Sequence, residues 1–237
     1  MMQKTALITG IGHRLGFYLA QKLLEQGYHV LGHYHQQRDS IDELRSMGVE
    51  LWQADFCQWD SLQAFAKGLE AVPRLDVLIH NASAFYPAAD SPTQQALDMA
   101  RFAAVHMQAP LLLMETLKKA LFQGEDSCVI AMTDIYVHHP NAEFHAYCAS
   151  KAGLDNLMQS YVRLLAPKVR VNCIEPGPIL FLDEHDEAHR QHVLQRTPLA
   201  REGGFEPIWQ TIRMILENSY LTGARIAVDG GRSVSQL

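Results

Sequence analysis

Short apolar runs alternate with amphipathic blocks along almost the whole chain, and this alternation limits the possible folds more than any other feature. The apolar runs are typical of buried strands, and they occupy residues 6–9, 28–34, 49–54, 75–80, 128–133, 169–174 and 225–228. The blocks between them predict helices at residues 15–26, 39–47, 61–69, 94–122, 144–166, 183–195 and 205–217. Strands that are apolar throughout indicate a parallel sheet covered by helices on both faces. The sequence therefore predicts an α/β fold, a Rossmann-type doubly wound parallel sheet of about seven strands, with ligands at the carboxyl ends of the strands.

Length and charge limit the number of domains and the kinds of partner that the chain can have. The chain has 237 residues and shows no linker, repeat or low-complexity segment, so we expect a single domain over residues 1–237. A net charge of −6 gives no reason to expect nucleic acid or an anionic membrane surface as a partner. The sequence contains neither a signal-peptide core nor an apolar run of about 18 residues. We therefore expect a cytoplasmic protein.

The four cysteines are Cys57, Cys128, Cys148 and Cys173. No two of them have CxxC spacing, and all four fall in apolar or element-like stretches. A disulfide framework or a zinc site is therefore disfavoured. We expect buried, reduced thiols.

The segment 9–16, TGIGHRLG, joins the first predicted strand to the first predicted helix. Glycines in this place let the backbone turn tightly and approach a pyrophosphate, and the helix N-terminus offers free N–H groups. A plain tight turn would use the same glycines, so it is the position after the first strand of a βαβ unit that favours a nucleotide site. The residues expected to line that site in this turn are Gly10, Gly12, His13, Arg14, Leu15 and Gly16.

The end of the second predicted strand indicates which nucleotide is bound. An NAD-binding chain usually places Asp or Glu there, to hold the ribose 2′-hydroxyl. This chain has His33, Tyr34 and His35 in that place, followed by Arg38. A carboxylate would repel a 2′-phosphate, whereas His35 and Arg38 can attract one. The sequence therefore favours NADP(H), bound in part by these four residues.

Tyr147 and Lys151 form a YxxxK pair near the start of the predicted helix 144–166. Residues at i and i+4 share one helical face. A free tyrosine has a pKa of about 10, and a neighbouring ammonium favours the phenolate and lowers that pKa. The pair therefore predicts acid–base catalysis by Tyr147, and the alternative is a chance pair on a packed helix.

The glycine turn after the first strand and the YxxxK pair after the fifth resemble those of the short-chain dehydrogenases/reductases, and the likeness extends over essentially the whole chain. The family's turn is TGxxxGxG, which Thr9, Gly10 and Gly16 match. Arg14 replaces the middle glycine, as in the pteridine reductases, and the chain is similar to bacterial dihydromonapterin reductases in particular. The resemblance implies that Arg14 reaches both the cofactor pyrophosphate and the edge of a pterin. The alternative is an ordinary surface arginine.

The same resemblance implies further cofactor contacts. In the family an Asp after the third strand contacts the adenine, and Asp55, followed by Phe56, takes that place here, although Asp55 is nearly as well explained as a helix N-cap. A turn after the fourth strand lies beside the cofactor, and a Pro-Gly turn after the sixth strand lies over it. The further residues implied to bind the cofactor are Asn81, Ala82, Ser83, Lys151, Pro176, Gly177 and Ile179.

Two positions differ from the usual pattern of the family. A serine often stands 13 residues before the tyrosine, and this chain has Asp134 there, as pteridine reductases do. A carboxylic acid can relay a proton to a pterin ring nitrogen, so we expect Asp134 to act with Tyr147 and Lys151; the alternative is a residue that caps the next turn. His106 takes the place of the family's Asn. It is interpreted either as holding the water of the proton relay or as a structural residue.

The substrate is expected to contact two further segments. In pteridine reductases an aromatic residue after the fourth-strand turn stacks on the pterin, and Phe85 has that place here, with core packing as the alternative. Residues 179–205 are expected to form a substrate lid, for which an ordinary solvated helix is the alternative. The stretches 179–181 and 184–186 are similar to those of dihydromonapterin reductases. The residues expected to bind substrate are Arg14, Phe85, Asp134, Tyr147 and Leu180.

Together these features predict NADPH-dependent reduction of a 7,8-dihydropterin to the tetrahydropterin, with side activity on dihydrofolate. The resemblance also implies a homotetramer, or a dimer, assembled through the two long helices. One alternative is a short-chain carbonyl reductase, which needs Tyr147 and Lys151 but has no use for Arg14 or Asp134. Another is a regulatory protein that binds NADP(H) without turnover.

Overall fold

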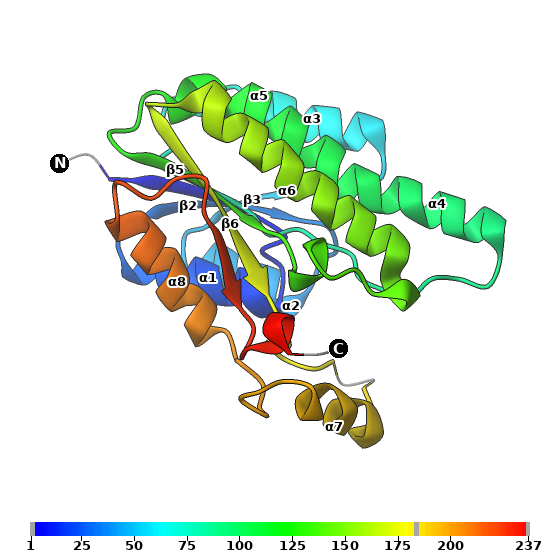
Figure 1. Cartoon of the computed structure of the whole chain (residues 1–237). Coiled ribbons are helices and arrows are strands. Elements are labelled where there is room, and N and C mark those ends of the chain that lie inside the picture. Colours follow the sequence, from blue (N-terminus) through cyan, green and yellow to red (C-terminus); the bar gives the residue numbers. More distant parts are fainter. Residues whose placement is uncertain (1–2, 183–184, 236–237) are drawn as a thin grey trace.

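The computed structural model describes residues 3–182 and 185–235, which form one seven-stranded sheet flanked by helices (Figure 1). The strands are β1 (Thr5–Thr9), β2 (His29–Tyr34), β3 (Glu50–Gln53), β4 (Val77–His80), β5 (Ser127–Met132), β6 (Val169–Pro176) and β7 (Arg225–Val228). They lie in the order β3-β2-β1-β4-β5-β6-β7, and every neighbouring pair is parallel. The predicted doubly wound sheet is confirmed. The strand order reverses between β1 and β4, which is where sheets of this kind bind their ligands.

Helices cover both faces of the sheet. They are α1 (Arg14–Glu25), α2 (Asp39–Ser46), α3 (Trp59–Leu69), α4 (Pro92–Ala103), α5 (Ala109–Leu121), α6 (His145–Leu165), α7 (Glu187–Gln195) and α8 (Glu206–Glu217). Figure 1 shows α1, α2 and α8 on one face and α3, α5 and α6 on the other, with α7 beyond the tip of β6. The carboxyl ends of the strands are therefore left open to ligands on the side where α7 lies.

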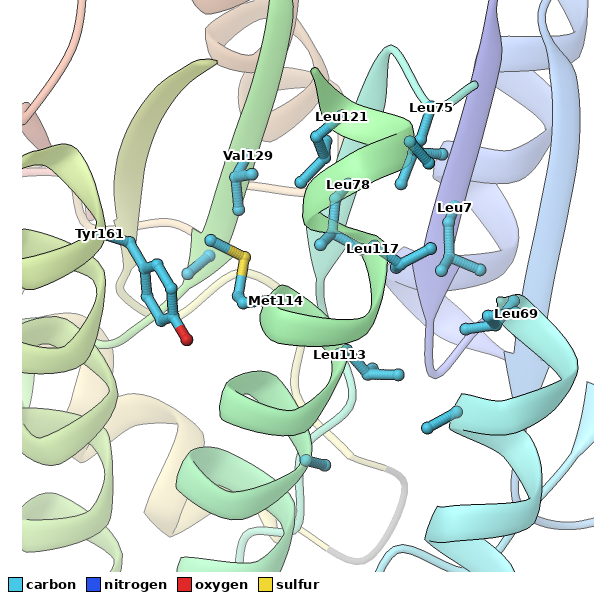
Figure 2. Close-up of a cluster of buried hydrophobic side chains, with 14 of the residues drawn as sticks. Leu7, Leu69, Leu75, Leu78, Leu113, Met114, Leu117, Leu121, Val129 and Tyr161 are labelled. Atoms are coloured by element: carbon cyan, nitrogen blue, oxygen red, sulfur yellow. The ribbon is translucent and has the colours of Figure 1, made fainter. Parts of the chain in front are cut away.

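Alternate residues of each strand point to opposite faces, so the sheet has a buried cluster on each side. On one face, Leu7 and Leu78 pack against α3, α5 and α6, and Figure 2 shows Leu117 of α5 next to them. On the other face, Ile8 and Ile79 pack against α1, α2 and α8. Burial on both faces is the reason that these strands are continuously apolar in the sequence.

The predicted helix 94–122 is interrupted, and this is the largest departure from the expected elements. A π-helical turn, Ala104–Gln108, joins α4 to α5, and in it the N–H of Ala109 bonds to the carbonyl oxygen of Ala104. Pro110 follows directly, and because it has no N–H it cannot donate the α-helical bond to residue 106. Turns of this kind are frequent at functional sites. This one directs His106 into the interior, where its side chain is fully buried.

Cys57 corrects the prediction that all four cysteines are buried. Cys128, Cys148 and Cys173 are buried, whereas Cys57 is exposed, and all four are free thiols. The neighbouring Phe56 takes the buried place in this turn, so Cys57 faces outwards. Among the described residues, no group of three or more His, Cys, Asp or Glu is placed to hold a metal ion. No helix in the described part of the chain is long and apolar enough to cross a membrane.

Candidate active site

The turn between β1 and α1 is shaped by positions that exclude a side chain. Gly10 has a φ of +71°, a conformation that residues with a Cβ rarely adopt, and a Cβ there would lie 2.7 Å from the Cα of Ala82. A Cβ on Gly16 would lie 2.1 Å from the carbonyl oxygen of Gly10. Arg14, at the family's middle-glycine position, also has a positive φ, of 51°. An arginine held in this region stores strain, which residues of this kind retain mostly at functional sites.

Asn81 fixes this turn to the end of β4. Its side-chain amide donates to the carbonyl oxygens of Thr9 and Gly10, each at 3.0 Å. The hydroxyl oxygen of Thr9 accepts in return from the N–H groups of Asn81 and Ala82, also at 3.0 Å each. The turn is therefore locked at the point where the strand order reverses.

The N-terminus of α1 is open to an anion. Its N-cap residue, His13, makes no side-chain hydrogen bond to the first helical turn, so the N–H groups there are not capped by a side chain and can donate to a ligand. Burial, Arg38 and Arg14, in that order, lower the pKa of His13, which places both guanidinium groups near it. Uncapped N–H groups beside two arginines form a site suited to phosphate.

Three side chains expected at the cofactor lie in the core instead. His33, Tyr34 and Phe56 are all buried, and the rings of His33 and Phe56 stack with centroids 3.9 Å apart. The Nδ1 of His33 accepts from the N–H of Gly10 at 3.2 Å, and its Nε2 donates to the carbonyl oxygen of Ala54 at 2.9 Å. Burial lowers the pKa of His33 to about 4, so the ring is neutral. These side chains pack beside the glycine turn, and His33 supports its backbone through the hydrogen bond to Gly10.

The rim of the nucleotide end carries the polar residues His35, Arg38 and Asp55. The side chains of His35 and Arg38 are exposed, and Arg38 donates to the side chain of Gln36 at 3.1 Å. The Asp55 carboxylate accepts from the N–H of Cys57 at 2.8 Å and lies 3.7 Å from the His35 ring. Asp55 thus closes its own turn but is not the N-cap of the next helix, which is Gln58, and its second oxygen faces His35.

Tyr147 and Asp134 are brought together from α6 and the end of β5. The phenol of Tyr147 donates to one Asp134 oxygen at 2.7 Å, and the other oxygen accepts from the N–H of Tyr136 at 2.9 Å. Asp134 therefore both caps the short turn that follows β5 and contacts Tyr147. Lys151, one turn further along α6, donates to the carbonyl oxygen of Met132 at 2.7 Å.

The pKa of Tyr147 moves in the opposite direction from the one the sequence predicted. Burial, and next the negative charge of Asp134, raise the pKa of Tyr147 well above 10. The ammonium of Lys151 is 5.8 Å from the centre of the tyrosine ring and bonds elsewhere, so it does not offset them. Burial also raises the pKa of Asp134 and lowers that of Lys151 to about 8. The phenol is thus protonated, which suits a proton donor better than a proton acceptor.

Phe85 lies at the mouth of this cluster and is not a core residue. It is 44% exposed, stacks on Phe144 with ring centroids 4.6 Å apart and meets Tyr147 edge-on at 4.8 Å. Phe144 and Tyr136, whose rings also stack on each other, are not among the residues expected from the sequence. Their position in the 134–147 segment, which contains both Asp134 and Tyr147, is the pattern that would have indicated them.

Arg14 connects the glycine turn to the predicted lid. Its guanidinium donates to the backbone carbonyl oxygens of Leu180 and Phe181. It is therefore not a free surface arginine. Leu180 itself is exposed, whereas Ile179 packs partly against the core beside α8.

The helix expected within the predicted lid is shorter than predicted and begins after a capping residue. α7 starts at Glu187, and the side chain of Asp186 accepts from the N–H of His189 at 2.7 Å. Residues 183–184, which belong to the predicted helix and include Glu184, lie outside the described residues. Before the predicted lid, the N–H of Gly177 donates to the carbonyl oxygen of Val228, and a Cβ at Gly177 would lie 2.6 Å from the Cβ of Asp229. The Pro176–Gly177 turn therefore lies against the end of β7.

Residues 10–233 match the protein family described as enoyl-(acyl carrier protein) reductase, and this match spans both the glycine turn and the Tyr147–Lys151 pair. The chain belongs to the short-chain dehydrogenase/reductase family. Among short-chain reductases, the dihydromonapterin reductase of Klebsiella pneumoniae is 38% identical over 231 residues, which make up 95% of each chain. That of Escherichia coli is 36% identical over 232 residues, again 95% of each chain. The solved structure of FolM alternative dihydrofolate reductase 1 from Brucella canis, complexed with NADP, has a TM-score of 0.88 at 28% identity and covers 99% of this chain and 95% of that chain.

Proposed function

We propose that this protein is an NADPH-dependent oxidoreductase that reduces a 7,8-dihydropterin of the dihydromonapterin type to the tetrahydropterin, with side activity on dihydrofolate. The observation that carries the proposal is the part-buried hydrogen bond between Tyr147 and Asp134. A carbonyl reductase has no use for this carboxyl group, whereas reduction across the C6=N5 bond of a pterin needs a proton at a ring nitrogen. The names of the relatives at 36–38% identity support the same substrate class.

The cofactor site fits NADPH by its donor chemistry. The free N–H groups at the start of α1 and the guanidinium of Arg14 suit a pyrophosphate, and the exposed His35 and Arg38 suit a 2′-phosphate. No carboxylate ends β2 itself, in the place where NAD-binding chains hold the ribose 2′-hydroxyl. When bound, NADPH supplies the hydride. The Brucella relative that is solved with NADP supports this choice.

The protein's own part in the reaction is to hold the substrate and deliver a proton. Burial raises the pKa of both Tyr147 and Asp134, and that of Tyr147 lies well above 10, so the phenol keeps its proton near neutral pH. We propose that this pair delivers the proton that reaches N5. The positive charge of Lys151 then compensates the negative charge that the pair acquires. Phe85 offers a ring face for stacking, and Arg14 offers donors to the pterin edge from below the lid.

The experiment that tests this function follows NADPH oxidation with dihydromonapterin, dihydrobiopterin, dihydrofolate and a panel of simple ketones and aldehydes. We expect turnover of the dihydropterins, with Asp134→Ser reducing that turnover more than any carbonyl activity. Turnover of carbonyls alone would leave the Tyr147–Lys151 pair its role and remove the pterin from the proposal. No turnover with any compound, together with tight NADPH binding, would favour the regulatory alternative.

The chain is also proposed to form a homotetramer in the cytoplasm through its long helices. Leu97 of α4, Leu111 of α5 and Leu164 of α6 are large apolar side chains with exposed fractions of 53%, 46% and 58%. Apolar residues on adjacent helices support burial between subunits. Light scattering coupled to size exclusion measures the assembly, and a monomer at micromolar concentration would contradict the proposal.

A further inference from the structure

His106 bridges two parts of the site that are remote in sequence. Its Nδ1 lies 2.8 Å from the hydroxyl oxygen of Ser150 on α6, and its Nε2 lies 2.9 Å from that of Ser83, after β4. The N–H of Ala84 also points to Nε2, at 3.4 Å. The ring is fully buried and lies edge-on to Tyr147 with centroids 5.6 Å apart. Both nitrogens are therefore used by the protein itself.

The hydrogen bonds select one tautomer of this ring. The hydroxyl of Ser150 donates its single hydrogen to the carbonyl oxygen of Tyr147 at 2.7 Å, so it can only accept from His106. The proton is therefore on Nδ1, and Nε2 is the acceptor for Ser83 and Ala84. Burial, and next the charge of Lys151, hold the pKa of His106 well below 6.5, so the ring remains neutral.

The connected groups do not make a proton path to the reacting atoms. From Ser83 the hydrogen bonds run through the imidazole to Ser150, and they end at the backbone carbonyl of Tyr147, not at its phenol or at Lys151. A backbone carbonyl cannot pass a proton onward. Both ring nitrogens also have protein partners, so neither remains to hold the water of a relay, and the geometry favours the structural interpretation.

We propose that His106 is a positioning residue that ties the segment Ser83–Phe85 to the helix of Tyr147 and thereby sets where Phe85 lies relative to Tyr147. This inference rests on the proposed function, because it gives Phe85 and Tyr147 the task of holding a flat ring. The π-helical turn before Pro110 is what allows His106 to reach inward to both partners. Without the bridge, the segment would keep its covalent connection to β4 but lose its connection to α6.

The test uses substitutions that retain one end of the bridge or neither. His106→Asn keeps a donor at the distance of Nδ1, so it retains Ser150 and loses Ser83. His106→Phe fills the site and loses both hydrogen bonds. We expect both variants to raise the KM for a dihydropterin about tenfold, with a smaller change in kcat, because loss of a buried hydrogen bond that orients the ring weakens binding.

A double-mutant cycle identifies the contact that matters. Ser83→Ala combined with His106→Asn should raise the KM for a dihydropterin no more than the more harmful of the two single substitutions does, because both break the same hydrogen bond. The pH profile of kcat should match that of the wild type in every variant. A shifted profile would instead identify a relay and overturn the inference.

Two measurements on the ligand-free protein do not depend on the substrate. Hydrogen exchange of the Ala84 and Phe85 amides should be faster in His106→Asn, and imidazole ¹⁵N shifts in the wild type should show a protonated Nδ1 that does not titrate between about pH 5.5 and 8.5. If the wild type reduces no dihydropterin, the proposed function fails, while exchange still decides whether the bridge exists. Unchanged exchange, or unchanged KM in an active enzyme with only lower stability, would overturn the positioning role.

Discussion

The two halves of the site differ in the kind of residue that forms them, which is glycines and neutral hydrogen-bonding groups in one and ionisable side chains in the other. The nucleotide turn, residues 9–16, is shaped by glycines and by hydrogen bonds between neutral groups, with Asn81 holding it to β4. The substrate half places Tyr147 and Lys151 in the interior beside the half-buried Asp134, and burial shifts the pKa of each. The first half contributes to the stability of the fold while it forms a binding surface. The second half holds ionisable groups out of water, which is unfavourable for folding and useful for proton transfer.

This difference separates the expected consequences of mutation. Changes in the nucleotide turn should lower stability and cofactor affinity together, because the same backbone serves both. Changes in the substrate half should lower activity with little loss of stability, or even with a gain. Arg14 belongs to both halves, since it lies in the turn and contacts the lid.

The largest expected effect is on the substrate half. Tyr147→Phe keeps the ring but removes the phenol that donates to Asp134. We expect kcat for a dihydropterin to fall about 10²- to 10⁴-fold, the range for loss of a general acid. NADPH affinity, measured by fluorescence titration, should be unchanged. A variant with wild-type kcat would show that the proton comes from another group.

A change in the nucleotide turn should be the next largest. Gly16→Ala places a Cβ 2.1 Å from the carbonyl oxygen of Gly10, and neither backbone can move freely. We expect the free energy of unfolding to fall by about 1–3 kcal/mol in urea titrations, as for other overpacked sites, and NADPH affinity to fall with it.

Gly12→Ala is the matched control in the same turn. Its nearest neighbour would be the terminal methyl of Ile41 at 3.3 Å, which can shift, so we expect a stability change within about 0.5 kcal/mol. Equal losses in the two variants would mean that the turn is not limited by the Gly10–Gly16 contact.

A pH dependence of stability tests whether the substrate half opposes folding. Burial lowers the pKa of Lys151 from 10.5 to about 8 in the folded protein. Between these values the unfolded chain binds more protons than the folded one, so stability rises with pH. Relative to Lys151→Met, the wild type should gain about 2 kcal/mol of unfolding free energy between pH 7 and 9.5. A difference that stays constant with pH would show that Lys151 is not desolvated.

The fold was largely predictable because its cause is local. Continuous apolar runs follow from burial on both sheet faces, and the predicted strands match the observed ones with small shifts at their ends. The exception, the π-helical turn before Pro110, arises in a stretch whose apolar spacing is helical on both sides. Pro110 was the available indication there, because a proline in the interior of a predicted helix removes a backbone hydrogen bond and kinks or breaks the helix.

The site was predictable in membership more than in contacts. Motif spacing brings Asp134, Tyr147 and Lys151 to one place, but it does not show which partner each side chain chooses. The sequence paired Tyr147 with Lys151, whereas the phenol bonds to Asp134 across a separation of 13 residues. The burial of His33 and the direction of the Tyr147 pKa both depend on desolvation, which results from packing of the whole chain and not from a local pattern.

The smallest expected effect is at Arg14, which lies in the nucleotide turn and also contacts Leu180 and Phe181. Its φ of 51° costs an L residue about 1–2 kcal/mol, so Arg14→Gly should raise the free energy of unfolding by about 1 kcal/mol, less whatever its hydrogen bonds to the lid contribute. The KM for a dihydropterin should rise about tenfold at the same time, because charged donors to the ring are lost. Ala200→Gly is the control: it relieves a φ of 48° away from the cluster and should stabilise the protein without changing KM. If Arg14→Gly destabilises the protein while Ala200→Gly stabilises it, the contacts of Arg14 with Leu180 and Phe181 outweigh its strain. The arginine then behaves like the rest of the nucleotide turn, which contributes to the stability of the fold.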